Sequence, residues 1–127
     1  MSLANWNILV VEDEADSMEL VQDVLNYSGI HSVGAASGEE ALHVLKGMST
    51  LPTLIILDLA LPGLNGWELM QTLKADKSLS RIPCVAITAF HTPELAEQAI
   101  GAGFNAYFAK PIDSMSFVRE LQTIVER

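Results

Sequence analysis

The feature that most constrains this chain is the run Leu54–Asp58, in which four apolar residues lead directly into a carboxylate. A short, wholly apolar run between turn residues is typical of a strand buried on both faces, as in a parallel sheet covered by helices. Ligands of open parallel sheets bind outside the carboxyl ends of the strands, so Asp58 would lie where chemistry is favoured. Taken alone, Asp58 could also be an ordinary turn carboxylate, and the other strand ends decide between the two interpretations.

The rest of the chain predicts a regular alternation of strands and helices. We expect strands over residues 6–11, 30–36, 54–58, 82–88 and 106–109. Segments with an apolar face of helical period predict helices over residues 16–28, 37–47, 66–76, 92–102 and 113–125. Short connections in such an alternation favour right-handed βαβ crossovers, which predicts an α/β fold: a doubly wound, five-stranded parallel sheet with five helices on its two faces. No repeat, low-complexity tract or linker interrupts the pattern, so residues 1–127 are expected to form one domain.

Local signals mark several helix ends. Ser37 followed by Glu40 has the spacing of a capping box. Thr92-Pro93 predicts a helix start, and either Asp113 or Ser114 is expected to cap the last helix. Gly29 is expected to end the first helix as a residue with positive φ.

The charge balance excludes some classes of partner. The chain has 16 acidic and 7 basic residues and a net charge of -9, which argues against unaided binding to nucleic acid or anionic membranes. No apolar stretch approaches the ~20 residues of a membrane span, and no leader pattern is present, so we expect a cytoplasmic protein. The single cysteine, Cys84, is expected to be a buried small hydrophobe. His31, His43 and His91 lack the spacing of a metal site and are expected to be solvated.

Polar residues of complementary chemistry follow four of the apolar runs. In chain order they are Glu12, Asp13, Asp58, Thr88 and Lys110. A parallel sheet brings such strand ends to one edge, where three ionised carboxylates would repel one another strongly without a cation. Carboxylate oxygens suit Mg²⁺, so we predict a Mg²⁺ site that could also hold a phosphoryl group.

Each of these residues also has an ordinary interpretation. Glu12 and Asp13 could be acids in the first turn of a helix, Thr88 a strand-end hydroxyl, and Lys110 a solvated loop lysine. Their joint occurrence at four different strand ends is much less expected by chance, which favours a shared site.

Four segments resemble the receiver domain of two-component response regulators, over nearly the whole chain. They are VVED at 10–13, LIILDLALPGLNGWEL at 54–69, ITA at 87–89 and YFAKP at 107–111. The resemblance implies the flavodoxin-like strand order 2-1-3-4-5. It also implies that Asp58 is the phosphoacceptor, that Asp13 and Asp58 bind Mg²⁺ directly with Glu12 assisting, and that the backbone carbonyl of Ala60 is a further metal ligand.

The resemblance implies roles for three more residues. Lys110 and Thr88 would each hold a phosphoryl oxygen, and Tyr107 would be the switch aromatic that turns inward when Thr88 moves. The Lys110–Pro111 peptide, often cis in this family, would aim the lysine. Ala60 cannot position a hydrolytic water through its side chain and Phe90 is bulky, so a changed dephosphorylation rate is expected.

The function implied is acceptance of a phosphoryl group from a histidine kinase or histidine phosphotransfer protein, not turnover of an external substrate. A downstream effector, an output domain or a second copy of the chain would bind the face of the last two helices. Whether the domain stands alone or belongs to a longer protein is left open by the sequence.

Two other functions stay open on the residues alone. A receiver-like interaction module that is never phosphorylated would keep the fold without the chemistry. A phosphatase of the haloacid dehalogenase type also uses a strand-end Asp, but that family has a second Asp two residues later, where this chain has Ala60.

Overall fold

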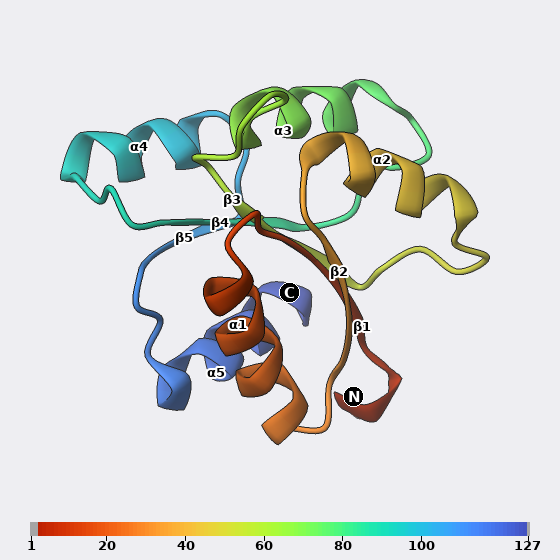
Figure 1. Ribbon diagram of the computed structural model, residues 1–127, viewed down its shortest axis with the longest axis vertical. Coiled ribbons are helices and arrows are strands. Elements are labelled where there is room, and N and C mark those ends of the chain that lie inside the picture. Colours follow the sequence, from red (N-terminus) through yellow and green to blue (C-terminus); the bar gives the residue numbers. More distant parts are fainter. Residues whose placement is uncertain (1–2, 127) are drawn as a thin grey trace.

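In the computed structural model, which describes residues 3–126, the chain forms a parallel sheet of five strands in the order β2-β1-β3-β4-β5 (Figure 1). The strands are β1 (Asn7–Val11), β2 (His31–Ala35), β3 (Leu54–Asp58), β4 (Cys84–Thr88) and β5 (Ala106–Ala109). After a short 3₁₀ turn (Leu3–Asn5), the helices are α1 (Ala15–Tyr27), α2 (Gly38–Gly47), α3 (Gly66–Ala75), α4 (Pro93–Gly101) and α5 (Ser114–Val125). The fold class and strand order expected from the sequence are confirmed.

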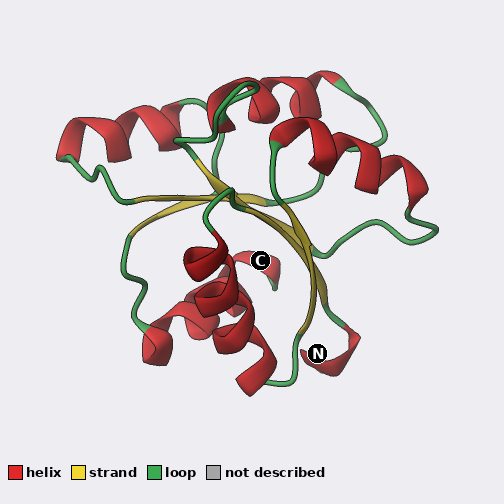
Figure 2. Ribbon diagram, in the orientation of Figure 1, coloured by secondary structure: helices red, strands yellow, loops and turns green. Residues whose placement is uncertain are grey.

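Helices cover both faces of the sheet in two layers, α2, α3 and α4 on one face and α1 and α5 on the other (Figure 2). Every residue of β3 and β4 is buried, which explains why these strands read as unbroken apolar runs. The edge strand β2 is largely half-exposed and has the weaker pattern.

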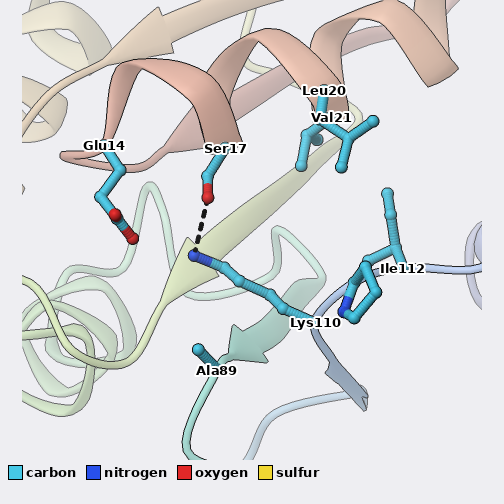
Figure 3. A pocket seen from close by; sticks show the side chains of 8 residues that line it. Glu14, Ser17, Leu20, Val21, Ala89, Lys110 and Ile112 are labelled. Atoms are coloured by element: carbon cyan, nitrogen blue, oxygen red, sulfur yellow. Dashed lines mark hydrogen bonds between the residues drawn. The ribbon is translucent and has the colours of Figure 1, made fainter.

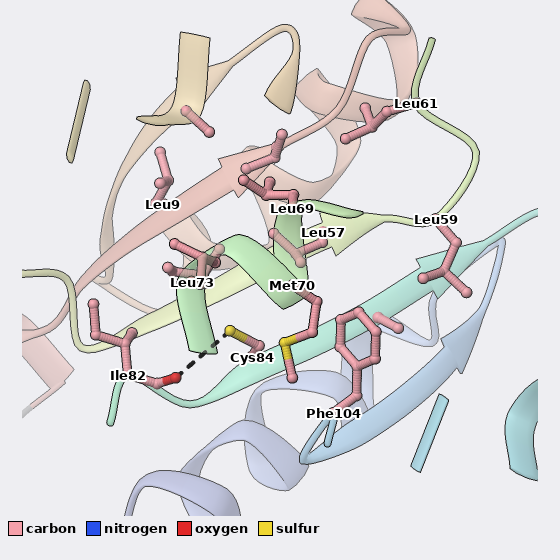
Figure 4. Packing of buried hydrophobic residues seen from close by; sticks show 14 of the residues in the cluster. Leu9, Leu57, Leu59, Leu61, Leu69, Met70, Leu73, Ile82, Cys84 and Phe104 are labelled. Atoms are coloured by element: carbon pink, nitrogen blue, oxygen red, sulfur yellow. Dashed lines mark hydrogen bonds between the residues drawn. The ribbon is translucent and has the colours of Figure 1, made fainter. Parts of the chain in front are cut away.

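The core beneath α3 is a close packing of aliphatic and aromatic side chains (Figure 4). Leu69, Met70 and Leu73 of α3 are buried against the sheet, and Trp67 meets Phe104 edge to face with ring centroids 5.9 Å apart. Cys84 lies in this cluster, as predicted, and burial raises the pKa of its thiol to about 11. The thiol therefore acts as a packing group and has little nucleophilic character.

Most predicted helix ends are confirmed. The Thr92 hydroxyl accepts a hydrogen bond from the Leu95 N–H at 3.0 Å, Asp113 caps α5, and Gly29 has a φ of +78°. The Ser37 hydroxyl accepts from the Glu40 N–H at 3.0 Å, which is one half of the predicted capping box; within the described residues 3–126, the Ser37 N–H makes no return bond to the Glu40 side chain. A reciprocal capping box between Asn65 and Glu68, which was not predicted, begins α3.

Three strands begin later than predicted. Trp6, Ile30 and Ile82 precede β1, β2 and β4, and their N–H groups bond to the carbonyls of Leu3, Leu25 and Leu79. All three side chains are nonetheless buried. The apolar pattern in the sequence reflects which residues are buried, whereas the start of a strand is defined by its pairing with a neighbour. Predicted and observed strand starts therefore differ by one or two residues. Within residues 3–126, no helix combines the length and the apolar character needed to cross a bilayer.

Candidate functional site

The parallel register brings the predicted site residues to one edge of the sheet. Val11 pairs with Leu57, and Asp58 pairs with Ile87 on the next strand. Thr88 in turn pairs with Ala109. Glu12, Asp58, Thr88 and Lys110 therefore lie at or just beyond the carboxyl ends of four adjacent strands.

Asp58 is the buried centre of this edge, with 3% of its surface exposed. One carboxylate oxygen, Oδ1, accepts a hydrogen bond from the backbone N–H of Ala60 at 2.9 Å. The other, Oδ2, accepts one from the ammonium group of Lys110 at 2.9 Å. Both oxygens thus have a defined donor, and the carboxylate is held in one orientation.

Lys110 reaches three groups from the loop after β5, where the Lys110–Pro111 peptide is cis, as the resemblance implied. Besides Asp58, its ammonium group donates to the carboxylate of Glu12. It also donates to the hydroxyl of Ser17 on α1 at 3.4 Å, the bond drawn in Figure 3. Ser17 was not predicted as a site residue. In the sequence it is one of several polar positions on an amphipathic helix, and only the packing of α1 brings it to Lys110.

Negative charge exceeds positive charge at the site. Carboxylate oxygens of Glu12, Asp13 and Asp58 lie within 4.8 Å of one another, and Glu12 and Asp58 are buried while Asp13 is exposed. Lys110 supplies one positive charge to two buried acids. Such a cluster of oxygen ligands with a charge deficit fits a hard divalent cation such as Mg²⁺.

The two buried acids titrate in opposite directions. Burial, reinforced by the hydrogen bond and the charge of Asp58, raises the pKa of Glu12 to about 7 despite Lys110. Burial alone would raise the pKa of Asp58 as well, but the hydrogen bonds from Glu12, Lys110 and the Ala60 N–H hold it below its usual value. Burial would lower the pKa of Lys110, yet both carboxylates together raise it. Asp58 is therefore the more fully ionised member of the pair at neutral pH.

Thr88 ends β4 at this edge of the sheet, and Tyr107 lies on the neighbouring strand β5, opposite Ala86. Thr88 is buried, and its hydroxyl oxygen accepts a hydrogen bond from the backbone N–H of Phe90 at 3.1 Å. The hydroxyl of Tyr107 is 3.0 Å from Nδ1 of His91. All three histidines are exposed, but His91 has a specific partner, which its position in the sequence did not indicate.

A groove of about 320 Å³ opens next to Lys110 (Figure 3). Leu20 and Val21 of α1 form one wall, and Pro111 and Ile112 form the other. The groove is lined mainly by apolar side chains. It lies next to Lys110, on the side of the site formed by α1.

Comparison with known proteins supports one family for the whole domain. Residues 8–122 match the family described as the response regulator receiver domain. The chain is 33% identical over 121 residues to an uncharacterised 14.6 kDa protein of Leptolyngbya boryana, covering 95% of this chain and 91% of that protein. It is also 33% identical over 117 residues to the polar-differentiation response regulator DivK of Brucella ovis, covering 92% and 94% of the two chains.

Solved structures share the same architecture. A candidate response regulator from Chloroflexus aurantiacus J-10-fl superimposes with a TM-score of 0.88 at 30% identity, over 96% of this chain and 98% of that one. The receiver domain of the sensor histidine kinase PA1611 from Pseudomonas aeruginosa PAO1 superimposes with a TM-score of 0.85 at 27% identity, over 96% and 98%. That structure has a magnesium ion coordinated in its active-site cleft.

Proposed function

This chain belongs to the family of response regulator receiver domains, and we propose that its Asp58 accepts a phosphoryl group from the phosphohistidine of a partner protein. The observation that carries the proposal is the buried Asp58 carboxylate, held at one oxygen by the Ala60 N–H and at the other by Lys110, each at 2.9 Å. A fixed and ionised carboxylate next to a cation is suited to nucleophilic attack on phosphorus.

In the proposed reaction, a carboxylate oxygen of Asp58 attacks the phosphorus atom in line. The phosphorus–nitrogen bond breaks, its electron pair returns to the imidazole of the donor histidine, and an aspartyl phosphate remains. The phosphoryl group carries about 1.5 to 2 negative charges in place of the one on the carboxylate, so the site gains up to about one, which Lys110 offsets from its present position beside Asp58. The Thr88 hydroxyl, which now accepts from the Phe90 N–H, moves away from that group and donates its own hydrogen to a phosphoryl oxygen.

Glu12, Asp13, Asp58 and the backbone carbonyl of Ala60 are the groups we propose to hold Mg²⁺. The close approach of the three carboxylates and the single ammonium group among them support this assignment. When bound, the ion would offset charge that develops on the transferred oxygens. Glu12 must then give up its proton, since a carboxylate binds metal in its ionised form.

The proposed partners use different surfaces. The groove between α1 and the loop after β5 adjoins Lys110 and suits a histidine kinase or histidine phosphotransfer protein that presents its phosphohistidine to Asp58. The surface formed by α4, β5 and α5 carries Tyr107 and is the proposed site for an effector, an output domain or a second copy. Phosphorylation would bias this surface between two arrangements through Thr88 and Tyr107.

The proposal is tested by incubating the protein with acetyl phosphate and Mg²⁺ and measuring intact mass. We expect one added phosphoryl group in the wild type and in Asp16→Asn, an exposed acid in the first turn of α1, and none in Asp58→Asn. Addition of beryllofluoride and Mg²⁺ should change the Trp67 fluorescence. No adduct and no response in the wild type would overturn the proposal in favour of an interaction module. Turnover of a small phosphoester that requires Asp58 would instead indicate a hydrolase.

A further inference from the structure

A hydrogen-bonded pair joins the loop before α4 to strand β5. Nδ1 of His91 and the hydroxyl of Tyr107 are 3.0 Å apart, and their rings lie with centroids 5.4 Å apart at an interplanar angle of 43°. His91 is exposed and directly precedes Thr92, the N-cap residue of α4. The position of Tyr107 is therefore tied to the segment that begins α4.

The surroundings of the Tyr107 hydroxyl indicate the direction of this bond. Burial raises the pKa of Tyr107, and the nearby backbone N–H of Thr92 opposes that shift. The neutral hydroxyl therefore keeps its hydrogen and can donate it. Nδ1 of His91 can accept it when the imidazole is neutral and carries its proton on Nε2.

The pair lies on the same face of the sheet as Thr88. Tyr107 is opposite Ala86 in the β4–β5 register, and Thr88 is two residues beyond Ala86, so both side chains project to the face covered by α2, α3 and α4. The loop between Thr88 and α4 is thus held at two points: the Thr88 hydroxyl accepts from the Phe90 N–H, and the Tyr107 hydroxyl bonds to His91.

We propose that His91 is a positioning residue that holds Tyr107 and the start of α4 in their unphosphorylated arrangement. The inference rests on the proposed function, in which Thr88 leaves the Phe90 N–H to reach a phosphoryl group. That step frees one end of the loop, and the His91–Tyr107 bond resists movement of the other end. Loss of the imidazole acceptor therefore favours the phosphorylated arrangement, and His91 sets how readily the domain changes state.

The test uses variants that separate the acceptor from the ring. His91→Phe keeps an aromatic ring beside Tyr107 but has no acceptor, whereas His91→Asn places an amide oxygen near the position of Nδ1. His43→Phe, which changes an exposed histidine on α2, is the matched control. In titrations with beryllofluoride and Mg²⁺, we expect H91F to bind about 3- to 10-fold more tightly than wild type, as loss of one net hydrogen bond implies. H91N and H43F should stay close to wild type.

NMR of the protein without any phosphoryl analogue provides a second readout. The chain has two tyrosines, and Tyr27, which is 95% exposed on α1, serves as the internal reference. We expect H91F to shift the ring signals of Tyr107 alone, and ¹⁵N shifts of wild-type His91 to indicate a protonated Nε2. The H91F and Tyr107→Phe changes should be non-additive in beryllofluoride affinity, because they remove the same bond.

Three outcomes would overturn the inference: unchanged Tyr107 signals and affinity in H91F, additive effects of H91F and Y107F, or a proton on Nδ1 of His91. Failure of the wild type to respond to beryllofluoride would instead overturn the proposed function. In that case the ring signals and the tautomer still decide whether His91 positions Tyr107.

Discussion

The sharpest structural prediction concerns Gly66, the first residue of α3, whose Cα lies against the backbone that carries Asp58. A Cβ added at Gly66 would be 2.5 Å from the Asp58 carbonyl oxygen and 2.7 Å from the Cα of Leu59. Both neighbours are backbone atoms, so no side-chain rotation can relieve the contact. Moving the Asp58 carbonyl to 3.0 Å requires a shift of about 0.5 Å, the difference between 3.0 and the 2.5 Å contact, at the residue proposed to be phosphorylated.

The expected cost of Gly66→Ala follows from two opposing effects. Overpacking of this kind costs about 1 to 3 kcal/mol. The restriction of the unfolded chain by alanine offsets about 0.4 to 1 kcal/mol of that. At Gly47, the last residue of α2, an added Cβ meets nothing within 4 Å. Gly47→Ala therefore restricts the unfolded chain without any overpacking cost. We therefore expect G66A to be less stable than G47A by roughly 1 to 3 kcal/mol.

Urea unfolding followed by tryptophan fluorescence measures this difference, and a beryllofluoride titration with Mg²⁺ measures the effect on the site. G66A should also bind beryllofluoride several-fold more weakly, whereas G47A should match the wild type. Equal stability and equal binding in the two variants would refute the argument that contact between α3 and the β3 backbone fixes Asp58.

Three further predictions follow from individual side chains. Asn65→Ala removes the capping box of α3 and should lower the free energy of unfolding by about 1 kcal/mol, measured against Asn26→Ala, an exposed asparagine in the last turn of α1. Cys84 should resist a thiol reagent in native protein at pH 8 and react only on unfolding, because burial raises its pKa to about 11; rapid native labelling would contradict this. Burial raises the folded-state pKa of Glu12 from its ordinary value of 4.5 to about 7, so its contribution to stability is lost as pH rises through about 7. Metal-free wild type should lose about 1 to 3 kcal/mol between pH 5 and 8 relative to Glu12→Gln, whereas parallel pH curves would contradict the shift.

The sheet could be predicted from the sequence because strands buried on both faces are unbroken runs of apolar residues. The run at 54–58 and its counterpart at 84–88 are buried at every residue, and the register then brings Asp58 next to Glu12 and Lys110. Residues that reach the site only through the packing of a helix or loop have no comparable pattern in the sequence. Ser17 and His91 occupy ordinary polar positions in their own segments, and their partners, Lys110 and Tyr107, are respectively 93 and 16 residues further along the chain.

The long sequence separation within the site has a consequence for how the protein matures. Glu12 and Lys110 are 98 residues apart. Lys110 directly follows β5, which is the last strand in the chain and lies at one edge of the sheet. During synthesis, Asp58 emerges long before the ammonium group that neutralises it. A chain that is still being synthesised, or that has locally unfolded, therefore lacks the positive charge that would stabilise a phosphoryl group on Asp58. We expect Asp58 to accept a phosphoryl group only after all five strands have assembled.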